Sequence, residues 1–327
     1  MHLLVKQLVQ MLIRAVSLAL PETRANKLER WRRGREDNWK FKRCDYVFVS
    51  HGKSGRTWAR VMISRYFKLA HTKIPDGIIL GFDNFHKLNT DVPKFFFTHD
   101  NYLRRYLGNE NSRRDYYDRK IVLLVRQPQD VAVSQYFQWK HRMKPYKKKL
   151  NNYPADDADL SIHDVVMHEG QGLPRIVRGL NEWIVELPNF KNLLVIRYED
   201  LRAQPERELA RLMDFVGESV DPEIVKEAVE FASVDNLRKM ETENHFWRSG
   251  SRMKAPDSAN PDSYKVRKAK VGGYRDYFND EQVARIDAFV EENLKPGFGY
   301  TAAEKPGESR GQTLGLCHSA QERATVR

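Results

Sequence analysis

The sequence predicts an α/β fold, a central and mostly parallel sheet flanked by helices, with a phosphate-binding loop after its first strand. Three observations lead to this prediction. Short apolar runs alternate with segments of helical periodicity between about residues 45 and 300. The run at 121–125 consists of consecutive aliphatic residues, as expected of a strand buried on both faces. A Gly/Ser-rich loop separates the first strand from the first helix. Together they indicate a single three-layer domain.

Four strands are expected, at 45–50, 94–98, 121–125 and 193–196. Apolar residues at helical spacing follow the first strand as far as about residue 69, and a second helix is expected to begin near Asp130. A third helix carries the same spacing up to Val216 and is ended by Gly217. A last helix is expected at about 280–294. Because strands alternate with helices, the expected sheet is parallel and covered on both faces.

The composition is that of a soluble globular protein, and the charge indicates an anionic partner. The chain has 327 residues, 41% hydrophobic and 31% charged, without an apolar run long enough for a transmembrane helix. Its 56 basic and 44 acidic residues give a formal charge of +12, which attracts nucleic acid, anionic membranes or ligands that bear phosphate or sulfate. Cys44 and Cys317 are too few for a disulfide scaffold or a zinc site, which is consistent with a reducing compartment.

Three regions are expected: an amphipathic helix and basic segment at 1–43, the α/β domain at 44–302 and a disordered tail at 303–327. Polar positions in residues 2–20 share one helical face, and Lys6 and Arg14 interrupt the apolar run that a signal peptide needs. Two interpretations of this helix stay open. It is an interfacial membrane anchor, or it packs on the domain or pairs two subunits as a homodimer. The expected location is cytoplasmic, peripheral on a membrane under the first interpretation.

The loop after the first strand has the composition of a phosphate site. It reads His51-Gly52-Lys53-Ser54-Gly55-Arg56-Thr57-Trp58 and leads into a helix N-terminus, where unpaired N–H groups and the helix dipole attract anions. Its glycines allow close approach of the backbone to a phosphate, and Lys53 supplies positive charge. Where the loop of nucleoside triphosphatases needs its first glycine, this chain has Val47. We therefore expect a phosphate loop of a different kind.

A second phosphate-binding element is expected directly after the strand at 121–125. Arg126 leaves this strand at its carboxyl end, where open α/β sheets bind ligands, and Ser134 follows about two helical turns later. A guanidinium and a hydroxyl that converge there suit a separate second phosphate. The alternative role for Arg126 is an ion pair with a nearby carboxylate.

Together these elements resemble the sulfotransferases that use 3′-phosphoadenosine-5′-phosphosulfate (PAPS), in particular the cytosolic type, over about residues 45–300. The 5′-phosphosulfate loop of that family reads Pro-Lys-Ser-Gly-Thr-Thr-Trp, and here Gly52 replaces Pro and Arg56 replaces the first Thr. The family's 3′-phosphate block, an Arg followed eight residues later by Ser, is matched at Arg126 and Ser134. Its strand that ends in Tyr-Glu-Asp-Leu is matched at 198–201.

The resemblance implies further donor-binding residues in the second half of the chain. The family's late block, Arg-Lys-Gly-x-x-Gly-Asp-Trp, is matched in part at 267–274, where Ala269 replaces Gly and Gly273-Tyr274 replaces Asp-Trp. Ser233 is similar to a family serine near the adenine. The residues implied to bind PAPS are Lys53, Ser54, Gly55, Arg56, Thr57, Trp58, Arg126, Ser134, Tyr198, Ser233, Arg267, Lys268 and Ala269.

Sulfuryl transfer to an alcohol needs a base for the acceptor proton and positive charge where the leaving phosphate becomes negative. His99 ends the strand expected at 94–98, and the family places its base in a Lys-Thr-His segment after such a strand. Phe97 replaces that Lys here, while Thr98 and His99 match. His99 is therefore the expected catalytic base, and Lys53 is expected to stabilise the departing adenosine 3′,5′-bisphosphate (PAP). No metal is expected, because no clustered carboxylates mark a Mg²⁺ site.

The acceptor is less well encoded than the donor. Residues 71–92 and 139–175 are the expected pocket-forming segments. In the second, Tyr146 lies beside a basic patch that suits an acidic glycan or lipid headgroup, or that is simply solvated. The patch consists of Lys144, Lys147, Lys148 and Lys149. The acceptor is thus expected to be a hydroxyl or amine of a small molecule, a lipid, a lipid-linked molecule or a glycan.

Two other functions stay open. A nucleotide or small-molecule kinase needs an intact triphosphatase loop and a metal-binding carboxylate after a strand, and neither is evident. A scaffold that binds the nucleotide without catalysis would be expected to lack Lys53 or His99, and both are present. Nucleic acid is not an expected partner, because the chain contains no recognised nucleic-acid-binding module.

Overall fold

The structure of the protein, a computed structural model, describes residues 20–304 except 72, 156–158 and 250–252. Residues 2–19 of the expected amphipathic helix and 305–327 of the expected tail lie outside this described part. At its centre is one sheet, whose strands are β1 (Tyr46–Ser50), β2 (Phe95–Thr98), β3 (Lys120–Val125) and β4 (Asn192–Arg197). The strands are all parallel, in the order β2-β1-β3-β4, which confirms the predicted α/β fold.

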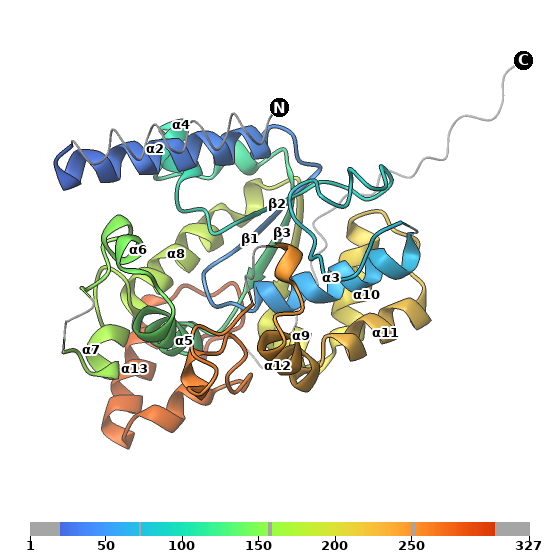
Figure 1. Cartoon of the computed structure of the whole chain (residues 1–327). Helices are drawn as coiled ribbons and strands as arrows, with labels where there is room; N and C mark the ends of the chain where they lie inside the picture. Colours follow the sequence, from blue (N-terminus) through green and yellow to red (C-terminus); the bar gives the residue numbers. More distant parts are fainter. Residues whose placement is uncertain (1–19, 72, 156–158, 250–252, 305–327) are drawn as a thin grey trace, which may run out of the picture.

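Helices cover both faces of the sheet (Figure 1). The α-helices are α2 (Glu22–Phe41), α3 (Arg56–Ala70), α4 (Leu103–Leu107), α5 (Pro128–His141), α6 (Pro145–Leu150), α7 (Ile162–Val166), α8 (Leu173–Glu186), α9 (Tyr198–Ala203), α10 (Pro205–Phe215), α11 (Pro222–Phe231), α12 (Val234–Thr242) and α13 (Asp280–Asn293). Short 3₁₀ helices lie at Arg114–Tyr116, Leu187–Asn189, Trp247–Ser249, Pro261–Ser263 and Gly273–Tyr277. The expected helices and strands agree with these bounds to within one or two residues.

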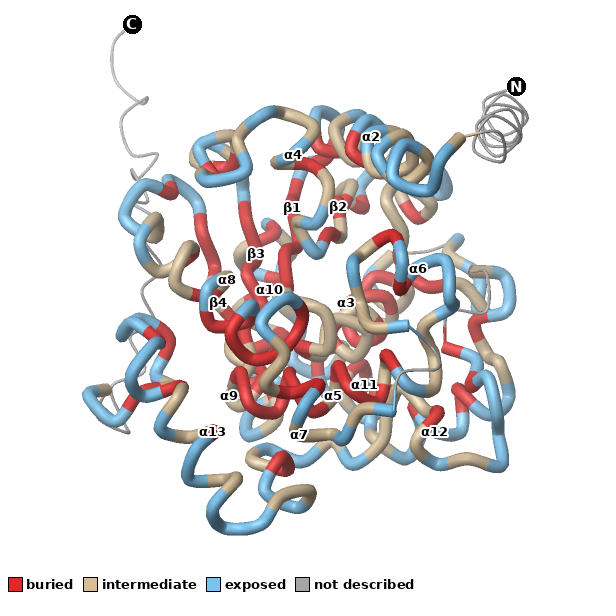
Figure 2. Tube along the Cα trace, turned by 90° about the vertical axis from the view of Figure 1, so that its left-hand side faces the viewer, coloured by how far each residue is buried: buried red, intermediate tan, exposed pale blue. Residues whose placement is uncertain are grey.

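The sheet separates two hydrophobic cores, because successive side chains of a strand point to opposite faces. In β1, Val47 and Val49 join the core under α5, α8 and α13, while Tyr46 and Phe48 join the core under α3, α10 and α11. Strand β3 divides its aliphatic residues in the same way. Figure 2 shows the strands buried along their length and the helices buried on their inner sides. The unbroken apolar runs in the sequence thus follow from burial on both faces.

The order of the strands places a binding site between β1 and β3. The chain leaves β1 into α3, which packs on one face, and leaves β3 into α5, which packs on the opposite face. The loops after these neighbouring strands therefore diverge and leave a crevice at the carboxyl edge of the sheet. Such a crevice is where open α/β sheets bind their ligands.

The basic segment before β1 forms the helix α2, which lies across the top of the sheet in Figure 1 beside α4. Gly34 permits close packing, since a Cβ atom there would lie 2.5 Å from Cβ of Tyr106. Arg30 donates hydrogen bonds of 2.9 and 2.6 Å to the carbonyl of Leu150 at the end of α6, which ties α6 to α2. Across residues 20–304, apart from the gaps given above, no helix has the length and hydropathy needed to span a membrane.

Candidate active site

A cavity of about 930 Å³ opens at the carboxyl edge of the sheet and collects most of the predicted site residues. Its lining includes Lys53, Gly55, Arg56, Thr57, Trp58, His99, Arg126, Ser134, Tyr198, Arg267, Lys268 and Ala269. Two predicted residues lie elsewhere. Ser54 is buried and lines a smaller adjoining cavity of about 310 Å³. Ser233 caps α12 through a 3.4 Å bond from the N–H of Asn236, and its neighbour Val234 lines the main cavity instead.

The loop after β1 has a tightly constrained backbone. Lys53 has φ of +71° and Gly55 has φ of +92°, both in the left-handed region that side chains disfavour. A Cβ atom at Gly55 would lie 2.5 Å from Cδ2 of Tyr198, so only glycine fits beneath that ring. Strain of this kind at Lys53 persists where the surrounding structure enforces it, which is typical of ligand-binding loops.

Arg126 links the two blocks that are predicted to bind phosphate. Its Nη1 donates a 3.1 Å hydrogen bond to the carbonyl of Lys53, and its guanidinium lies 4.2 Å from the ring centroid of Tyr198. Its Nη2 lies 3.3 Å from the carboxylate of Asp130. The ion pair anticipated as an alternative role is thus present, yet the buried Nε of Arg126 has no hydrogen-bond partner among the described residues. A buried donor without a partner is costly, and an anion in the cavity would satisfy it.

Asp130 attaches the late segment to the first half of the chain. Its buried carboxylate accepts hydrogen bonds of 3.0 Å from each of the backbone N–H groups of Gly272 and Tyr274. Just before them, Ala269, which stands where the family motif has glycine, has φ of +51°. That conformation costs an alanine about 1 kcal/mol relative to glycine, so the departure in the sequence is tolerated at a modest energetic cost.

We expect Asp130→Asn to lower the free energy of unfolding by about 3 kcal/mol. The buried carboxylate accepts two backbone hydrogen bonds and pairs with Arg126, and the substitution removes its charge. Urea unfolding followed by circular dichroism measures this change. Asp276→Asn is the matched control, since Asp276 is an exposed carboxylate of the same segment that pairs with Lys268 and Lys270. An equal loss of stability in both variants would contradict the role assigned to Asp130.

Trp58 presents a fixed aromatic ring at the end of the cavity beyond Tyr198. Its Nε1 donates a 2.9 Å hydrogen bond to the carbonyl of Ala232, and its ring packs edge-on against Tyr198 at 5.9 Å. The guanidinium of Arg202 lies 5.3 Å from the centroid of the Trp58 ring. An aromatic ring held in this way, beside Val234 and Leu237 of α12, makes a flat surface suited to a planar base.

Lys53 lies among cations. Burial first, and then the positive charges of Lys265, Arg142, Arg267 and Arg126, lower the pKa of its ammonium to about 7. The cavity lining has Asp130 as its one carboxylate among the described residues, and that group already pairs with Arg126. A surplus of positive charge in a partly desolvated cavity favours bound anions strongly. The set of donors therefore fits a ligand with several phosphate or sulfate groups.

His99 is held in the tautomer that a base requires. Its ring nitrogens contact the carbonyl of Ser50, at 2.8 Å from Nδ1, and Nη2 of Arg56, at 2.6 Å from Nε2. A guanidinium only donates hydrogen bonds, so Nε2 carries the lone pair and Nδ1 carries the hydrogen. Although the ring faces the cavity, the surrounding protein and then the charge of Arg56 lower the pKa of His99 well below its ordinary value. The imidazole is thus neutral at pH 7.

Arg56, which stands where the family motif has Thr, is expected to add to the effect of burial on the pH dependence of this base. Low pH inactivates a base by protonation, and the lowered pKa of His99 puts this loss of activity well below pH 6.5. Arg56→Met removes the nearby charge, so the pKa of His99 rises and the acid limb of kcat/KM moves to higher pH. Stopped assays of kcat/KM between pH 4.5 and 8 measure the position of this acid limb. An unchanged limb, with unchanged folding, would show that Arg56 does not act on His99.

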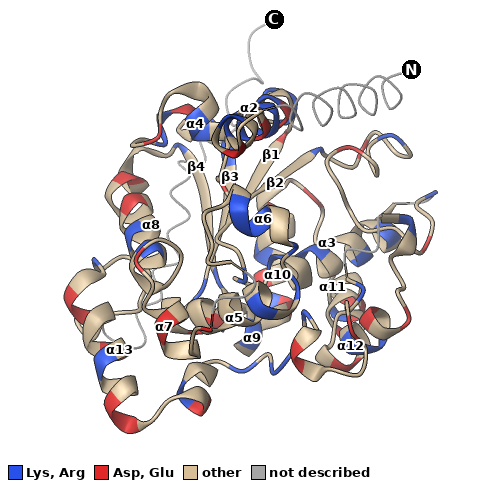
Figure 3. Cartoon of the chain, turned by 60° about the vertical axis from the view of Figure 1, so that its left-hand side comes forward, with Lys and Arg blue, Asp and Glu red and all other residues tan. Residues whose placement is uncertain are grey.

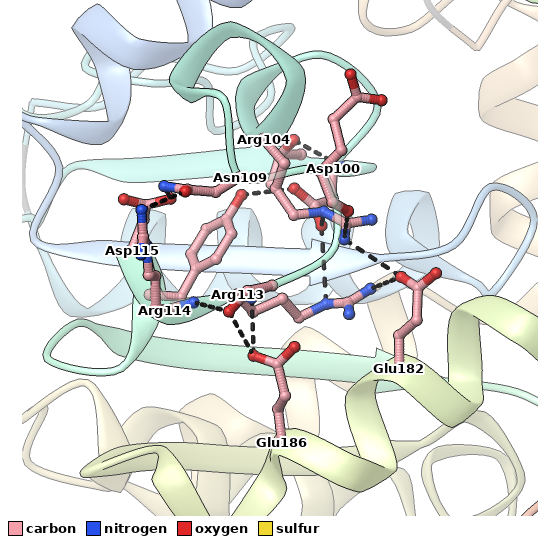
Figure 4. Close-up of polar contacts among 12 residues, drawn as sticks. Asp100, Arg104, Asn109, Arg113, Arg114, Asp115, Glu182 and Glu186 are labelled. Carbon is pink, nitrogen blue, oxygen red and sulfur yellow. Dashed lines mark hydrogen bonds and ion pairs between the residues drawn. The ribbon is translucent and has the colours of Figure 1, made fainter.

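A buried polar network anchors the segment that follows His99 (Figure 4). Asp100 has φ of +55°, and its carboxylate accepts a 2.8 Å hydrogen bond from Tyr116 and pairs with Arg104 at 2.8 Å. Arg113 continues the network, pairing with Glu182 of α8 at 3.1 Å. These contacts join the end of β2 to α4 and α8. They hold the backbone that carries the imidazole, so its position does not depend on a flexible loop.

Several lining residues have no motif that sequence reasoning could use. His51 begins the loop after β1 but lies before the family motif, and Gln135 follows Ser134. Three further segments contribute Arg142, Arg175 and Lys265. Only their nearness in space gives them a place in the site. In the sequence, only closeness to a recognised block, as Lys265 is close to Arg267, could have indicated that such a residue lies in the site.

A family model described as a sulfotransferase domain matches residues 115–298. This chain belongs to the sulfotransferase family. Curated relatives agree: cytosolic sulfotransferase 12 of Arabidopsis thaliana is 25% identical over 284 residues, 80% of each chain. Cytosolic sulfotransferase 10 of the same plant is 32% identical over 181 residues, 54% of this chain and 50% of that relative. Flavonol 3-sulfotransferase of Flaveria bidentis is 24% identical, over 79% of this chain and 84% of its own. The protein is a sulfotransferase enzyme.

Solved structures show the same fold. Mouse sulfotransferase SULT7A1, complexed with PAP, aligns with 78% of this chain and 86% of its own at a TM-score of 0.50 and 19% identity. Retinol dehydratase, in complex with androsterone and the inactive cofactor PAP, aligns with 80% and 83% at a TM-score of 0.51 and 20% identity. The chain thus shares its overall fold with these two proteins. Within residues 20–304, less the gaps, no group of three His, Cys, Asp or Glu side chains is placed to hold a metal.

Proposed function

We propose that the cavity binds PAPS across the loops after β1 and β3 and transfers its sulfuryl group to a hydroxyl or amine held beside His99. In this arrangement Lys53, Thr57 and the first-turn N–H groups of α3 face the 5′-phosphosulfate. Arg126, Ser134 and the segment at 267–269 face the 3′-phosphate, and Trp58 faces the adenine. The observation that carries the proposal is the buried, unpartnered Nε of Arg126, which lies beside the constrained loop of Lys53.

The chain's own residues supply what the transfer needs. His99 accepts the acceptor's proton at Nε2 once Arg56 has moved from that nitrogen, and the 2.8 Å bond from Nδ1 to Ser50 holds the ring in place. A bond forms between the acceptor oxygen and sulfur as the bond from sulfur to the bridging phosphate oxygen breaks. Lys53 stabilises the negative charge that remains on the phosphate.

The acceptor is proposed to be a small molecule, with a lipid, lipid-linked molecule or glycan as narrower options. Two of the relatives are flavonol sulfotransferases, which supports a small hydroxylated acceptor. Attachment to a membrane through residues 1–43 and a homodimer stay proposals. Vesicle binding of the full chain and of a chain without residues 1–20 tests the first, and sedimentation tests the second.

Thermal unfolding with candidate ligands tests the proposed donor site. We expect PAP to raise the melting temperature, with much weaker effects from ATP with Mg²⁺ and from a short DNA duplex. Arg126→Ala should reduce the effect of PAP, because the 3′-phosphate loses its guanidinium partner. Stabilisation by ATP with Mg²⁺ alone would favour a kinase. Stabilisation by PAP without any consumption of PAPS in an acceptor screen would favour a non-catalytic scaffold.

A further inference from the structure

The acceptor side of the cavity carries positive charge beyond the donor-binding residues. The described part of the lining is rich in lysine and arginine, with Asp130 as its one carboxylate. PAPS brings about four negative charges, and the residues proposed above to hold it lie around the loops after β1 and β3. Three further cations line the same cavity from α6, its N-cap residue and α8: Lys147, Lys144 and Arg175.

The lysines of the basic patch divide into two pairs with different surroundings. Lys148 is buried, with its ammonium 4.7 Å from the ring centroid of Trp139, and Lys149 pairs with Glu22 at 3.0 Å. Lys144, the N-cap residue of α6, and Lys147, within that helix, are exposed, and both line the cavity. Figure 3 shows the positive charge of α6 between α2 and the rest of the domain. Only the second pair is therefore placed to meet a ligand.

Arg175, in the first turn of α8, brings a third cation to this wall. Its Nη1 donates a 3.2 Å hydrogen bond to the carbonyl of Gly170, which is a neutral partner. Its charge acts on two residues of the lining, His51 and Tyr153, and it helps to keep His51 neutral. The wall itself is fixed, because Gln135 donates to the Tyr153 hydroxyl at 2.9 Å and Arg30 anchors the end of α6.

We infer that the acceptor of this sulfotransferase carries an anionic group, which Lys144, Lys147 and Arg175 bind while the acceptor hydroxyl faces His99. This inference rests on the proposed function. Cations gathered in one cavity repel one another, and a carboxylate, phosphate or sulfate on the acceptor relieves that repulsion. With a neutral acceptor, and with PAPS bound, the described part of the chain places no carboxylate of the cavity lining against these three charges.

Three phenols of similar size test the inference: 4-ethylphenol, 4-hydroxyphenylacetate and 4-hydroxybenzylphosphonate. With PAPS as donor, we expect kcat/KM for at least one anionic phenol to exceed that for 4-ethylphenol by about tenfold. The two anionic phenols distinguish a carboxylate from a phosphate-like group. Lys144→Gln combined with Lys147→Gln should remove most of this preference, while 4-ethylphenol is affected little. Lys149→Gln, on the same helix but paired with Glu22, should keep it.

A binding measurement separates this inference from the proposed function. Calorimetry with PAP-saturated protein should show the anionic phenols binding about tenfold more tightly than 4-ethylphenol, whether or not sulfuryl transfer occurs. The same measurement on the Lys144→Gln, Lys147→Gln variant should show no difference between them. Equal binding of charged and neutral phenols by the unaltered protein would overturn the inference and leave the donor site intact. Failure to bind PAP would instead overturn the proposed function.

Discussion

His99→Ala should lower kcat by about 10² to 10⁴-fold while PAP binding stays close to that of the unaltered protein. A positioned general base contributes about this much to proton transfer, and His99 itself is not among the residues proposed to contact the nucleotide. Sulfuryl transfer from labelled PAPS gives kcat, and calorimetry with PAP gives the binding constant.

The neutral state of His99 makes a second measurement possible. Because its pKa is lowered well below the usual value, the unaltered enzyme should keep its activity down to pH values at which an ordinary histidine would be protonated. The acid limb of kcat/KM should therefore vanish in His99→Ala along with most of the activity. His86→Ala is the control, since His86 contacts the carbonyl of Val92 outside the cavity lining. Near-normal turnover in His99→Ala would remove this residue from the mechanism.

Lys53→Ala should lower kcat by about 10² to 10³-fold, with a smaller loss of PAP affinity. The ammonium is placed to act on charge that develops during transfer, and such electrostatic groups contribute more to the transition state than to ground-state binding. Single-turnover assays with saturating PAPS separate the chemical step from binding. A variant that loses PAP affinity but keeps kcat would show that Lys53 only holds the donor.

The lowered pKa of Lys53 predicts that PAP binding takes up a proton. With a pKa of about 7, Lys53 is mostly neutral at pH 8 in the absence of ligand, and the negative charge of PAP favours the protonated form. Affinity for PAP should therefore fall as pH rises above 7. Calorimetry at pH 8 in two buffers of different ionisation enthalpy measures the uptake. Lys53→Arg should bind PAP with little uptake, because a guanidinium stays charged throughout this range. Equal uptake in Lys53→Arg would assign the proton to another group.

The fold could be predicted from the sequence because burial leaves a local record. The strand at 121–125 is aliphatic throughout since helices cover both of its faces, and Gly217, with φ of +82°, follows the helix that it ends. The phosphate loop was also readable, because a glycine such as Gly55 marks a backbone conformation and a close approach that few other residues allow.

Contacts between distant segments decided the rest, and they leave no fixed spacing in the sequence. The two hydrogen bonds that Asp130 accepts from the N–H groups of Gly272 and Tyr274 join residues more than a hundred positions apart. They set where the late segment meets the first half of the chain. The role of Arg56 depended on its distance from His99, not on its place in the loop.

The sequence by itself determined the parallel α/β architecture. It also marked the two blocks proposed to bind phosphate and the histidine at the end of β2, since each follows from local pattern or a short motif. Only the tertiary structure showed that the two blocks meet through Arg126 and the carbonyl of Lys53. Only the structure showed that Lys144 and Lys147 line the cavity, whereas Lys148 packs on Trp139 and Lys149 pairs with Glu22. The physical reason is that charge and hydrogen bonding act through space, so their consequences appear once the chain has folded.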